Sequence, residues 1–312
     1  MIKSGVNYLK TTELSVVVPT YNEKSNIYKL VESLEFVLKD INWEIIFVDD
    51  NSPDKTAEEV RKISKVNSKV HIIHRIGRRG LSSACVEGAI YASSKYVLIM
   101  DADMQHDETI IIRMLNTIKS GNYNLIVGSR FVDGASASTG LSKIRENGSK
   151  LAIWMSQLIL KPIQLCDTMS GFFMFERQLL VKYAESFSPN GFKILLDFIM
   201  CAKKEIKIKE IGYAMRARYS GDSKMNHAIV LEYLQLLIEH SIGKIFPARF
   251  IFFVLVGTSG LFLHLVNLFI FYKIFSYDFY TSQLIATSIS ITSNYLINNI
   301  FTFRERMLKG VR

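Results

Sequence analysis

The chain reads Tyr96-Val97-Leu98-Ile99-Met100-Asp101-Ala102-Asp103-Met104-Gln105-His106 at the point where an apolar run meets two carboxylates. Residues 96–100 have the length and composition of a buried strand. Acidic side chains directly after such a strand lie at the carboxyl end of the sheet, where open α/β sheets bind ligands. Oxygen ligands at this spacing can hold a hard divalent cation, and such a cation can neutralise a diphosphate. An ordinary turn is the alternative, because Asp-x-Asp is common in turns.

Short apolar runs alternate with amphipathic segments through the first two hundred residues. Strands are expected at residues 14–18, 44–48, 70–73, 96–100, 125–127 and 172–175. Helices are expected at residues 25–38, 81–92, 107–119 and 195–202. Another helix should take its cap and first turn from Asn51-Ser52-Pro53-Asp54 and end near residue 63. This alternation predicts the α/β class, with a mostly parallel, doubly wound sheet.

Composition narrows the class of protein. The chain of 312 residues has a formal net charge of +9, which suits an anionic membrane surface, a phosphorylated substrate or a nucleic acid. It contains no basic-aromatic module for nucleic acid, so we expect no nucleic-acid partner. The cysteines Cys85, Cys166 and Cys201 are far apart and form no Cys-x-x-Cys pair, which argues against structural disulfides and a zinc site.

Two apolar stretches near the C-terminus predict a membrane domain. Residues 250–271 are uncharged and long enough to span a bilayer, and residues 280–301 form a second, more polar candidate span. Residues 227–244 have apolar side chains at helical spacing, which predicts a helix at the membrane surface or, alternatively, one packed in the core. The expected domains are a soluble domain at 1–226, an interfacial helix at 227–245 and a two-span membrane domain at 246–312.

Charges around the two spans predict their orientation. The loop between the spans carries only Lys273 and Asp278. Basic side chains flank the spans on the other side, at Lys244, Arg249, Arg304, Arg306, Lys309 and Arg312. The positive-inside rule therefore predicts a multi-pass protein with both termini in the cytoplasm. The N-terminus lacks an apolar signal segment, so the soluble domain is expected in the cytoplasm as well.

Polar side chains follow four of the predicted strands, at residues 19–23, 48–52, 101–106 and 128–130. The carboxyl ends of parallel strands share one edge of the sheet, so these segments should converge on one crevice. A nucleotide needs a carboxylate for its base or ribose and an aromatic or apolar wall for stacking. Asp49 or Asp50 and Tyr21 offer these groups. Capping of the next helix is the alternative role for the two aspartates, and an ordinary loop position is the alternative for Tyr21.

These segments resemble known sequence motifs. Three of them resemble family 2 glycosyltransferases of the GT-A fold: Val17-Val18-Pro19-Thr20-Tyr21-Asn22-Glu23, Val48-Asp49-Asp50-Asn51-Ser52-Pro53-Asp54 and Asp101-Ala102-Asp103-Met104-Gln105-His106. Four others resemble the dolichyl-phosphate mannose synthases within that family: Gly128-Ser129-Arg130-Phe131-Val132, Asp167-Thr168-Met169-Ser170-Gly171-Phe172, Gly191-Phe192-Lys193-Ile194-Leu195-Leu196 and Arg218-Tyr219-Ser220-Gly221-Asp222-Ser223-Lys224. The resemblance covers about residues 14 to 226.

The resemblance implies substrates and a cofactor. They are a GDP-mannose donor, a dolichyl or polyprenyl phosphate acceptor in a lipid bilayer, and Mg2+ or Mn2+. It assigns the nucleotide-sugar site to Pro19, Tyr21, Glu23, Asp49, Asp50, Asp101, Ala102, Asp103, Gln105, Arg218 and Lys224. It assigns the metal and the diphosphate to Asp101, Asp103 and Gln105. It assigns the acceptor phosphate to Arg130, Arg145 and Ser149. It assigns catalysis to Asp103, Arg130, Arg145, Arg218 and Lys224.

The chain departs from the family pattern at three places. Leu81-Ser82-Ser83-Ala84 replaces a commoner Leu-Gly-Thr-Ala. Met215-Arg216 replaces a common aromatic pair, which leaves the wall of the sugar pocket less defined. The tail from Arg249 to Arg304 resembles the first half of a GtrA-like membrane domain, with two spans where four are usual. Either the anchor is reduced, or spans of two subunits pair in a homo-oligomer.

Charge suggests the mechanism. A lipid phosphate is already anionic at neutral pH, so it can attack the sugar without a general base, provided that cations offset its repulsion from the diphosphate. Direct attack from the opposite face inverts the anomeric centre and gives a β-linked product. Two alternatives stay open at this point: a polyprenyl-phosphate glucosyltransferase that uses UDP-glucose, and a non-catalytic membrane scaffold or transport subunit.

Overall fold

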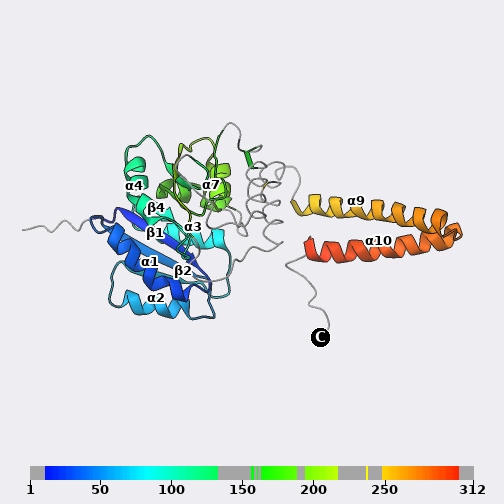
Figure 1. Ribbon diagram of the computed structural model, residues 1–312, viewed down its shortest axis with the longest axis horizontal. Coiled ribbons are helices and arrows are strands. Elements are labelled where there is room, and N and C mark those ends of the chain that lie inside the picture. The colour runs from blue at the N-terminus through cyan, green and yellow to red at the C-terminus, as the bar shows by residue number, and fades with distance from the viewer. Residues whose placement is uncertain are drawn as a thin grey trace, which may run out of the picture. The chain divides into compact units, whose positions relative to one another are not determined.

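The computed structural model describes residues 11–132, 156–157, 160, 163–187, 194–216, 237 and 248–301 (Figure 1). The chain divides into two compact units, Met1–Tyr233 and Leu234–Arg312, and each unit is described here by itself. Arg145, Ser149, Arg218 and Lys224 lie outside the described residues, as does the expected interfacial helix except for Leu237.

A seven-stranded sheet forms the centre of the first unit, in the order β3-β2-β1-β4-β6-β5-β7. The strands are β1 (Leu14–Thr20), β2 (Trp43–Asp49), β3 (Val70–His74), β4 (Tyr96–Ile99), β5 (Leu125–Ser129), β6 (Phe173–Glu176) and β7 (Ile208–Gly212). The strand pairs β1–β2, β2–β3, β1–β4 and β5–β7 are parallel, whereas β6 is antiparallel to both of its neighbours, β4 and β5. The carboxyl ends of the other six strands therefore share one edge, and β6 begins at that edge.

Helices cover both faces of the sheet. They are α1 (Lys24–Val37), α2 (Thr56–Ser64), α3 (Leu81–Tyr91), η1 (Glu108–Ile110), α4 (Ile111–Lys119), α6 (Arg177–Tyr183), η2 (Ala184–Ser186) and α7 (Ile194–Ala202). Side chains of α1, α2 and α4 pack in one core cluster with Val16, Val18 and Phe47. The strand period of two sends Val17 to the other face. There Gly88 of α3 lies so close to Val17 that a Cβ would collide with it.

The second predicted helix starts later than expected. Asn51-Ser52-Pro53-Asp54 does not form its first turn, because Lys55 has a left-handed φ of 68° and α2 begins at Thr56. The Asp54 carboxylate instead accepts a hydrogen bond from the backbone N–H of Thr56 at 2.9 Å. Neither β7 nor α6 is predicted by the sequence pattern. Among the described strands, β7 pairs with β5 alone, at the edge of the sheet, and its Lys209 and Glu210 hide the strand pattern.

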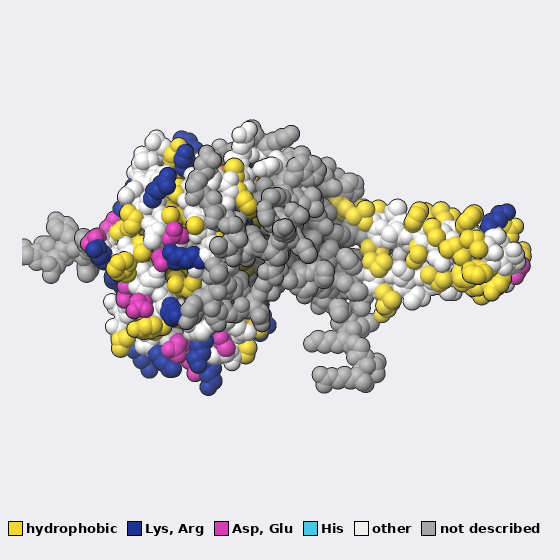
Figure 2. Space-filling view, in the orientation of Figure 1, with side chains coloured by type: hydrophobic (Ala, Val, Ile, Leu, Met, Phe, Trp, Pro, Cys, Tyr) yellow, Lys and Arg dark blue, Asp and Glu magenta, His cyan; other side chains and the backbone are white. Residues whose placement is uncertain are grey.

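The second unit contains a helical hairpin. Its helices are α9 (Ala248–Phe269) and α10 (Phe279–Phe301), joined through a π-helical turn, η3 (Ile270–Ile274). Among the described residues, the stretch Phe253–Ile274 alone is long and apolar enough to cross a membrane by length and composition. Apolar side chains cover much of the visible surface of the hairpin (Figure 2).

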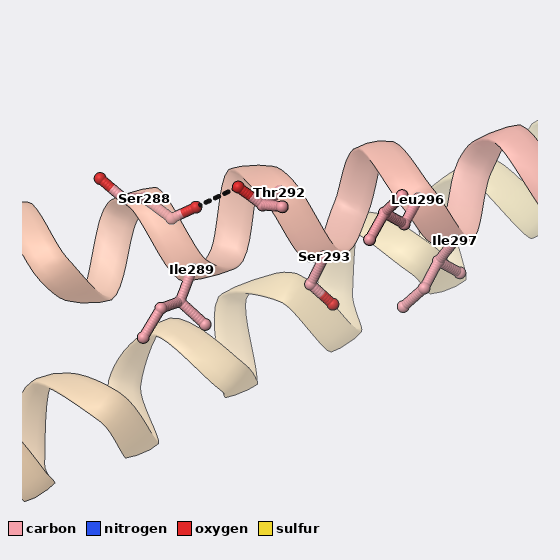
Figure 3. Close-up of a pocket in the computed structure, with 6 residues that line it drawn as sticks. All are labelled: Ser288, Ile289, Thr292, Ser293, Leu296 and Ile297. Carbon is pink, nitrogen blue, oxygen red and sulfur yellow. Dashed lines mark hydrogen bonds between the residues drawn. The ribbon is translucent and has the colours of Figure 1, made fainter. Parts of the chain in front are cut away.

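The helix α10 is more polar than α9. Ser288, Thr292 and Ser293 lie with three apolar side chains along a shallow open groove on α10 (Figure 3). The hydroxyls of Ser288 and Thr292 donate to backbone carbonyls four residues earlier, each at 2.8 Å, so their hydrogen bonds are met within the helix. Gly260 of α9 allows the close approach of Asn294, because a Cβ at this position would overlap the Asn294 amide.

Candidate active site

The predicted strand-end segments meet at the shared edge of the sheet. In the strand register, Thr20 at the end of β1 lies beside Asp49 at the end of β2. Val17 of β1 lies beside Ile99 of β4, two residues before Asp101. On the other side of β4, Ser129 at the end of β5 lies beside Gly212 of β7. The sheet thus brings residues 19–23, 48–52, 101–106 and 128–130 to one edge, as expected for a ligand site in an open α/β sheet.

The segment after β1 carries Pro19, Tyr21 and Glu23, all of which are partly exposed. The guanidinium of Arg79 lies over the Tyr21 ring, 4.7 Å from its centre, which is a cation–π contact. Glu23 accepts a hydrogen bond from the side chain of Asn26 at 2.8 Å, and its own N–H donates to the Thr56 hydroxyl at 3.1 Å. The polar and aromatic groups predicted for a nucleoside are therefore located beside the ends of β1 and β2.

Asp49 is fully buried and its carboxylate holds the loop after β2. It accepts hydrogen bonds from the Ser52 N–H at 2.9 Å, the Ser52 hydroxyl at 2.5 Å and the Thr20 hydroxyl at 3.1 Å. These are the bonds of a capped turn. Of the two roles considered for Asp49, this geometry is that of a cap for the loop rather than of a group that faces a ligand.

Asp50 belongs to a buried charge network. Its carboxylate accepts a hydrogen bond from Arg75 Nη1 at 2.6 Å and one from the Gly80 N–H at 2.8 Å. Arg75 is 1% exposed, and its Nε lies 3.3 Å from a carboxylate oxygen of Glu87. The arginine compensates two acidic groups at once, and it fixes the carboxylate of Asp50 at the end of β2.

Asp101 and Asp103, the two carboxylates after β4, lie on a tight turn. Met104 has a φ of 63°, and Asp103 Oδ1 accepts the Gln105 N–H at 3.1 Å. Two hydrogen bonds join Gln105 to Arg216. The Gln105 side-chain amide donates to the Arg216 carbonyl at 3.1 Å, and the Arg216 backbone N–H donates to the Gln105 carbonyl at 2.9 Å. The Asp101 side chain is 45% exposed and lies against Gly171. The turn thus fixes Asp103 and Gln105 and places Asp101 beside them.

His106 is hydrogen-bonded to this turn and packs against two aromatic side chains. Its Nδ1 accepts the Asp101 N–H at 3.2 Å, so the proton of the neutral ring sits on Nε2, which lies 3.8 Å from Asp101 Oδ2. The ring stacks on Phe172, with centres 4.8 Å apart, and meets the edge of Tyr213. Burial lowers the pKa of His106 to about 4, and burial also raises the pKa of Tyr213. The histidine is therefore neutral at physiological pH.

The donor atoms at this turn suit a hard divalent cation. Among the described residues, no group of three or more His, Cys, Asp or Glu side chains forms a complete metal site. Asp101, Asp103 and Gln105 supply two carboxylates and one amide. Ions such as Mg2+ are commonly held in this way, by one or two carboxylates together with the phosphates of a substrate. These residues therefore fit a cation that a bound diphosphate would complete.

Arg130 forms a bidentate ion pair that the sequence did not reveal. Its Nε and Nη2 donate to the carboxylate of Asp167 at 2.7 and 2.8 Å, and its backbone N–H donates to the same group at 3.1 Å. The side chain of Asp167 is fully buried and that of Arg130 is 12% exposed. Burial disfavours the charged guanidinium, but the hydrogen bonds and the charge of Asp167 outweigh it and raise the pKa of Arg130.

Comparison with known proteins identifies the family. Residues 15–184 match glycosyl transferase family 2, and residues 252–312 match the GtrA/DPMS transmembrane domain. The chain belongs to glycosyl transferase family 2. The predicted enzyme class, a glycosyltransferase, is thereby confirmed, as is the predicted GT-A fold with a C-terminal membrane tail. The second match, together with the apolar stretch Phe253–Ile274, identifies a membrane protein.

Individual relatives agree with this assignment. The dolichol-phosphate mannosyltransferase of Pyrococcus furiosus is 31% identical over 294 residues, which are 94% of this chain and 82% of that protein. The dolichol-phosphate mannosyltransferase of Saccharomyces cerevisiae is 31% identical over 258 residues, which are 78% of this chain and 92% of that protein.

A solved structure shares the fold. It is the glucosyl-3-phosphoglycerate synthase from Mycobacterium tuberculosis in complex with Mn2+, UDP-glucose and phosphoglyceric acid. It superposes with a TM-score of 0.56 at 16% identity, over 73% of this chain and 79% of that one.

Several residues of the site were not singled out from the sequence. They lie on five different segments: Arg75, His106 and Asp167 contact the predicted residues directly, whereas Glu210 supports Asp167 and Tyr213 packs against His106. The motifs quoted for the resemblance include His106 and Asp167 but give neither a role. No local pattern marks the other three, because their partners are far away in the sequence.

Proposed function

We propose that the chain is an inverting glycosyltransferase that moves mannose from GDP-mannose to a dolichyl or polyprenyl phosphate, giving a β-linked mannosyl phosphate lipid and GDP. The observation that carries this proposal is the site at the carboxyl edge of the sheet, where the partly exposed carboxylate of Asp101 lies close enough to Arg130 for its charge to act on the guanidinium. Identity of 31% with a dolichol-phosphate mannosyltransferase, over 94% of the chain, supports this substrate class.

The donor would bind along the ends of β1, β2 and β4. Tyr21 and Glu23 would contact the nucleoside with Pro19, and Asp50 would offer its carboxylate in the orientation that Arg75 fixes. Asp101, Asp103 and Gln105 would hold Mg2+ or Mn2+. When bound, such a cation stabilises the negative charge that grows on the leaving diphosphate. Arg218 and Lys224, outside the described residues, would add positive charge beside the same phosphates.

The acceptor would meet basic side chains on the other part of the edge. Arg130, with Arg145 and Ser149 outside the described residues, would bind the lipid phosphate and offset its repulsion from the donor. A phosphate oxygen then attacks the anomeric carbon, a new carbon–oxygen bond forms, and the bond to the diphosphate breaks. The phosphate is already deprotonated at neutral pH, so no side chain needs to remove a proton. Attack opposite the leaving group inverts the anomeric centre.

The C-terminal hairpin would keep the enzyme at its lipid substrate. A polyprenyl chain does not readily leave the bilayer, so an anchored enzyme meets it at the membrane surface. We propose that both α9 and α10 cross the bilayer and that both chain ends lie in the cytoplasm. The polar side chains along α10 would then favour packing against protein, including the hairpin of a second copy, over exposure to lipid.

Donor competition tests the proposed function. The purified full chain in vesicles with polyprenyl phosphate is given labelled GDP-mannose or labelled UDP-glucose, and lipid products are separated by thin-layer chromatography. We expect label in the lipid from GDP-mannose only, with one GDP released for each lipid product. Label from UDP-glucose alone would indicate a glucosyltransferase. Failure of either donor to label lipid, with the protein folded, would contradict transfer and favour a scaffold or transport subunit.

A further inference from the structure

The ion pair between Arg130 and Asp167 is a buried charged contact at the shared edge, held by hydrogen bonds on both sides. Asp167 engages the arginine through three hydrogen bonds, two to its guanidinium and one to its backbone. Asp167 is itself held in place. Its N–H and that of Cys166 donate to the two oxygens of the Glu210 carboxylate, at 3.0 and 2.8 Å.

The hold on Asp167 comes from the strands that carry Arg130. Glu210 lies on β7, paired in register with Val127 of β5, three residues before Arg130. Farther along the loop, the Ser170 hydroxyl donates to the carbonyl of Gly128 at 2.6 Å. The carboxylate is therefore fixed to the same pair of strands that presents the arginine. Such a closed set of contacts leaves the guanidinium one orientation.

We infer that Asp167 is a positioning residue for glycosyl transfer, which fixes the guanidinium of Arg130 so that its third nitrogen, Nη1, is left for the acceptor phosphate. The inference rests on the proposed function, in which Arg130 contacts that phosphate. Among the described residues, no hydrogen bond reaches Nη1, because the pair with Asp167 uses Nε and Nη2. The pair uses two of the five guanidinium N–H groups, so Arg130 would meet the phosphate through the three that remain, two on Nη1 and one on Nη2.

The negative charge of Asp167 gives it a competing role, which would change acceptor binding in the opposite direction. A fully buried carboxylate next to the guanidinium makes the pair neutral overall, so Asp167 also weakens the attraction between Arg130 and a phosphate. If the loss of attraction is the larger effect, removing the negative charge of Asp167 strengthens acceptor binding. If positioning is the larger effect, removing the carboxylate that holds the guanidinium lets Arg130 move and weakens acceptor binding. The sign of the change in KM for the lipid phosphate therefore separates the two roles.

Two substitutions at Asp167 provide the test in the full chain reconstituted in vesicles. Asp167→Asn removes the charge and one of the two fork acceptors, and Asp167→Glu keeps the charge but moves the carboxylate by one methylene. We expect both variants to raise the KM for polyprenyl phosphate by about 10- to 100-fold, by analogy with the loss of a hydrogen-bond partner behind a metal ligand. The KM for GDP-mannose should change less than threefold, on the order of experimental scatter.

Controls separate this role from general damage to the fold. Glu205→Gln removes one carboxylate from an exposed pair with Lys182 and should leave both KM values unchanged. The unfolding midpoint of each variant is measured in parallel, and kinetics are expressed per folded enzyme. Should Asp167→Asn fail to fold, Asp167→Glu carries the test, because the loss of attraction predicts no change for it whereas positioning predicts a loss.

The possible results separate a failure of the positioning role of Asp167 from a failure of the proposed function. A lower KM for the lipid phosphate in Asp167→Asn would overturn the positioning role in favour of the loss of attraction. Unchanged kinetics per folded enzyme in both Asp167 variants, with a lower unfolding midpoint, would reduce Asp167 to a structural residue. Arg130→Gln tests the underlying assignment: if this variant keeps the wild-type KM and turnover, then the proposed contact between Arg130 and the acceptor fails first.

Discussion

Substitution of Gly171 by alanine tests the proposed cation site with one methyl group. A Cβ built on Gly171 would lie 2.9 Å from Asp101 Oδ2, whereas ordinary contact begins at 3.4 Å. The carboxylate must therefore move by about 0.5 Å, which is the limit of displacement that a preorganised site tolerates. The φ of Gly171 lies outside the left-handed range, so alanine fits the backbone without strain.

The same geometry predicts a small effect on stability. The Asp101 side chain is 45% exposed and can rotate away from the new methyl group. An alanine on a compatible backbone stabilises a fold by about 0.4–1 kcal/mol through the unfolded chain, which offsets the residual contact. We expect the free energy of unfolding to change by less than about 1 kcal/mol. The loss should appear in the affinity for Mn2+, which we expect to fall about 10- to 100-fold.

The assay is a titration with Mn2+ in the presence of GDP, followed by electron paramagnetic resonance, together with urea unfolding. Gly88→Ala is the matched control, because its methyl group would overlap the side chains of Val17 and Val48 in the core rather than the Asp101 carboxylate. It should cost about 1–3 kcal/mol of stability and leave the Mn2+ affinity of the folded protein intact. Wild-type Mn2+ affinity in Gly171→Ala would refute the placement of a cation beside Asp101.

Three further predictions concern charged groups. Because the pKa of His106 falls from 6.5 to about 4 on folding, its contribution to stability is complete above pH 6.5 and is lost as the pH falls toward 4. Between pH 7 and pH 4.5 the free energy of unfolding, measured in urea, should fall by about 2 kcal/mol more in the wild type than in His106→Gln, and equal falls in the two proteins would contradict a buried neutral histidine. Arg75→Met leaves the carboxylate of Asp50 uncompensated and should cost about 3–5 kcal/mol of stability. The control Arg78→Met, at an exposed pair, should cost about 0–1 kcal/mol, so similar losses in the two variants would argue against the buried network. Arg218→Ala should raise the barrier to transfer by about 2–4 kcal/mol, and full turnover in this variant would remove Arg218 from the site.

Local sequence patterns were enough to predict much of the sheet. Runs such as Leu14–Thr20 and Trp43–Asp49 are apolar on both faces, so their strand character does not depend on distant partners. The edge strand β7 lacked this signal, because Lys209 and Glu210 interrupt its apolar residues. The antiparallel insertion of β6 between β4 and β5 could not be predicted, since strand order depends on contacts across the fold.

At the site too, local patterns were predictable from the sequence and long-range contacts were not. The motif residues could be placed at one edge because each follows a strand, and parallel strands end together. The roles of the neighbouring aspartates Asp49 and Asp50 could not be separated, because they depend on which distant residues bind each carboxylate. Ser52 and Thr20 then hold the first, while Arg75 holds the second. The partner of Arg130 lies 37 residues away, a separation that no local pattern encodes.

The most direct test of glycosyl transfer to a lipid phosphate is the structure of its product. The full chain in vesicles is incubated with GDP-mannose, polyprenyl phosphate and Mn2+, and the lipid fraction is analysed by mass spectrometry and by phosphorus and proton nuclear magnetic resonance. We predict mannose joined through oxygen to the lipid phosphate in the β configuration, with an equal amount of GDP. An α-linked lipid, or GDP released together with free mannose and no lipid product, would contradict direct attack by the lipid phosphate.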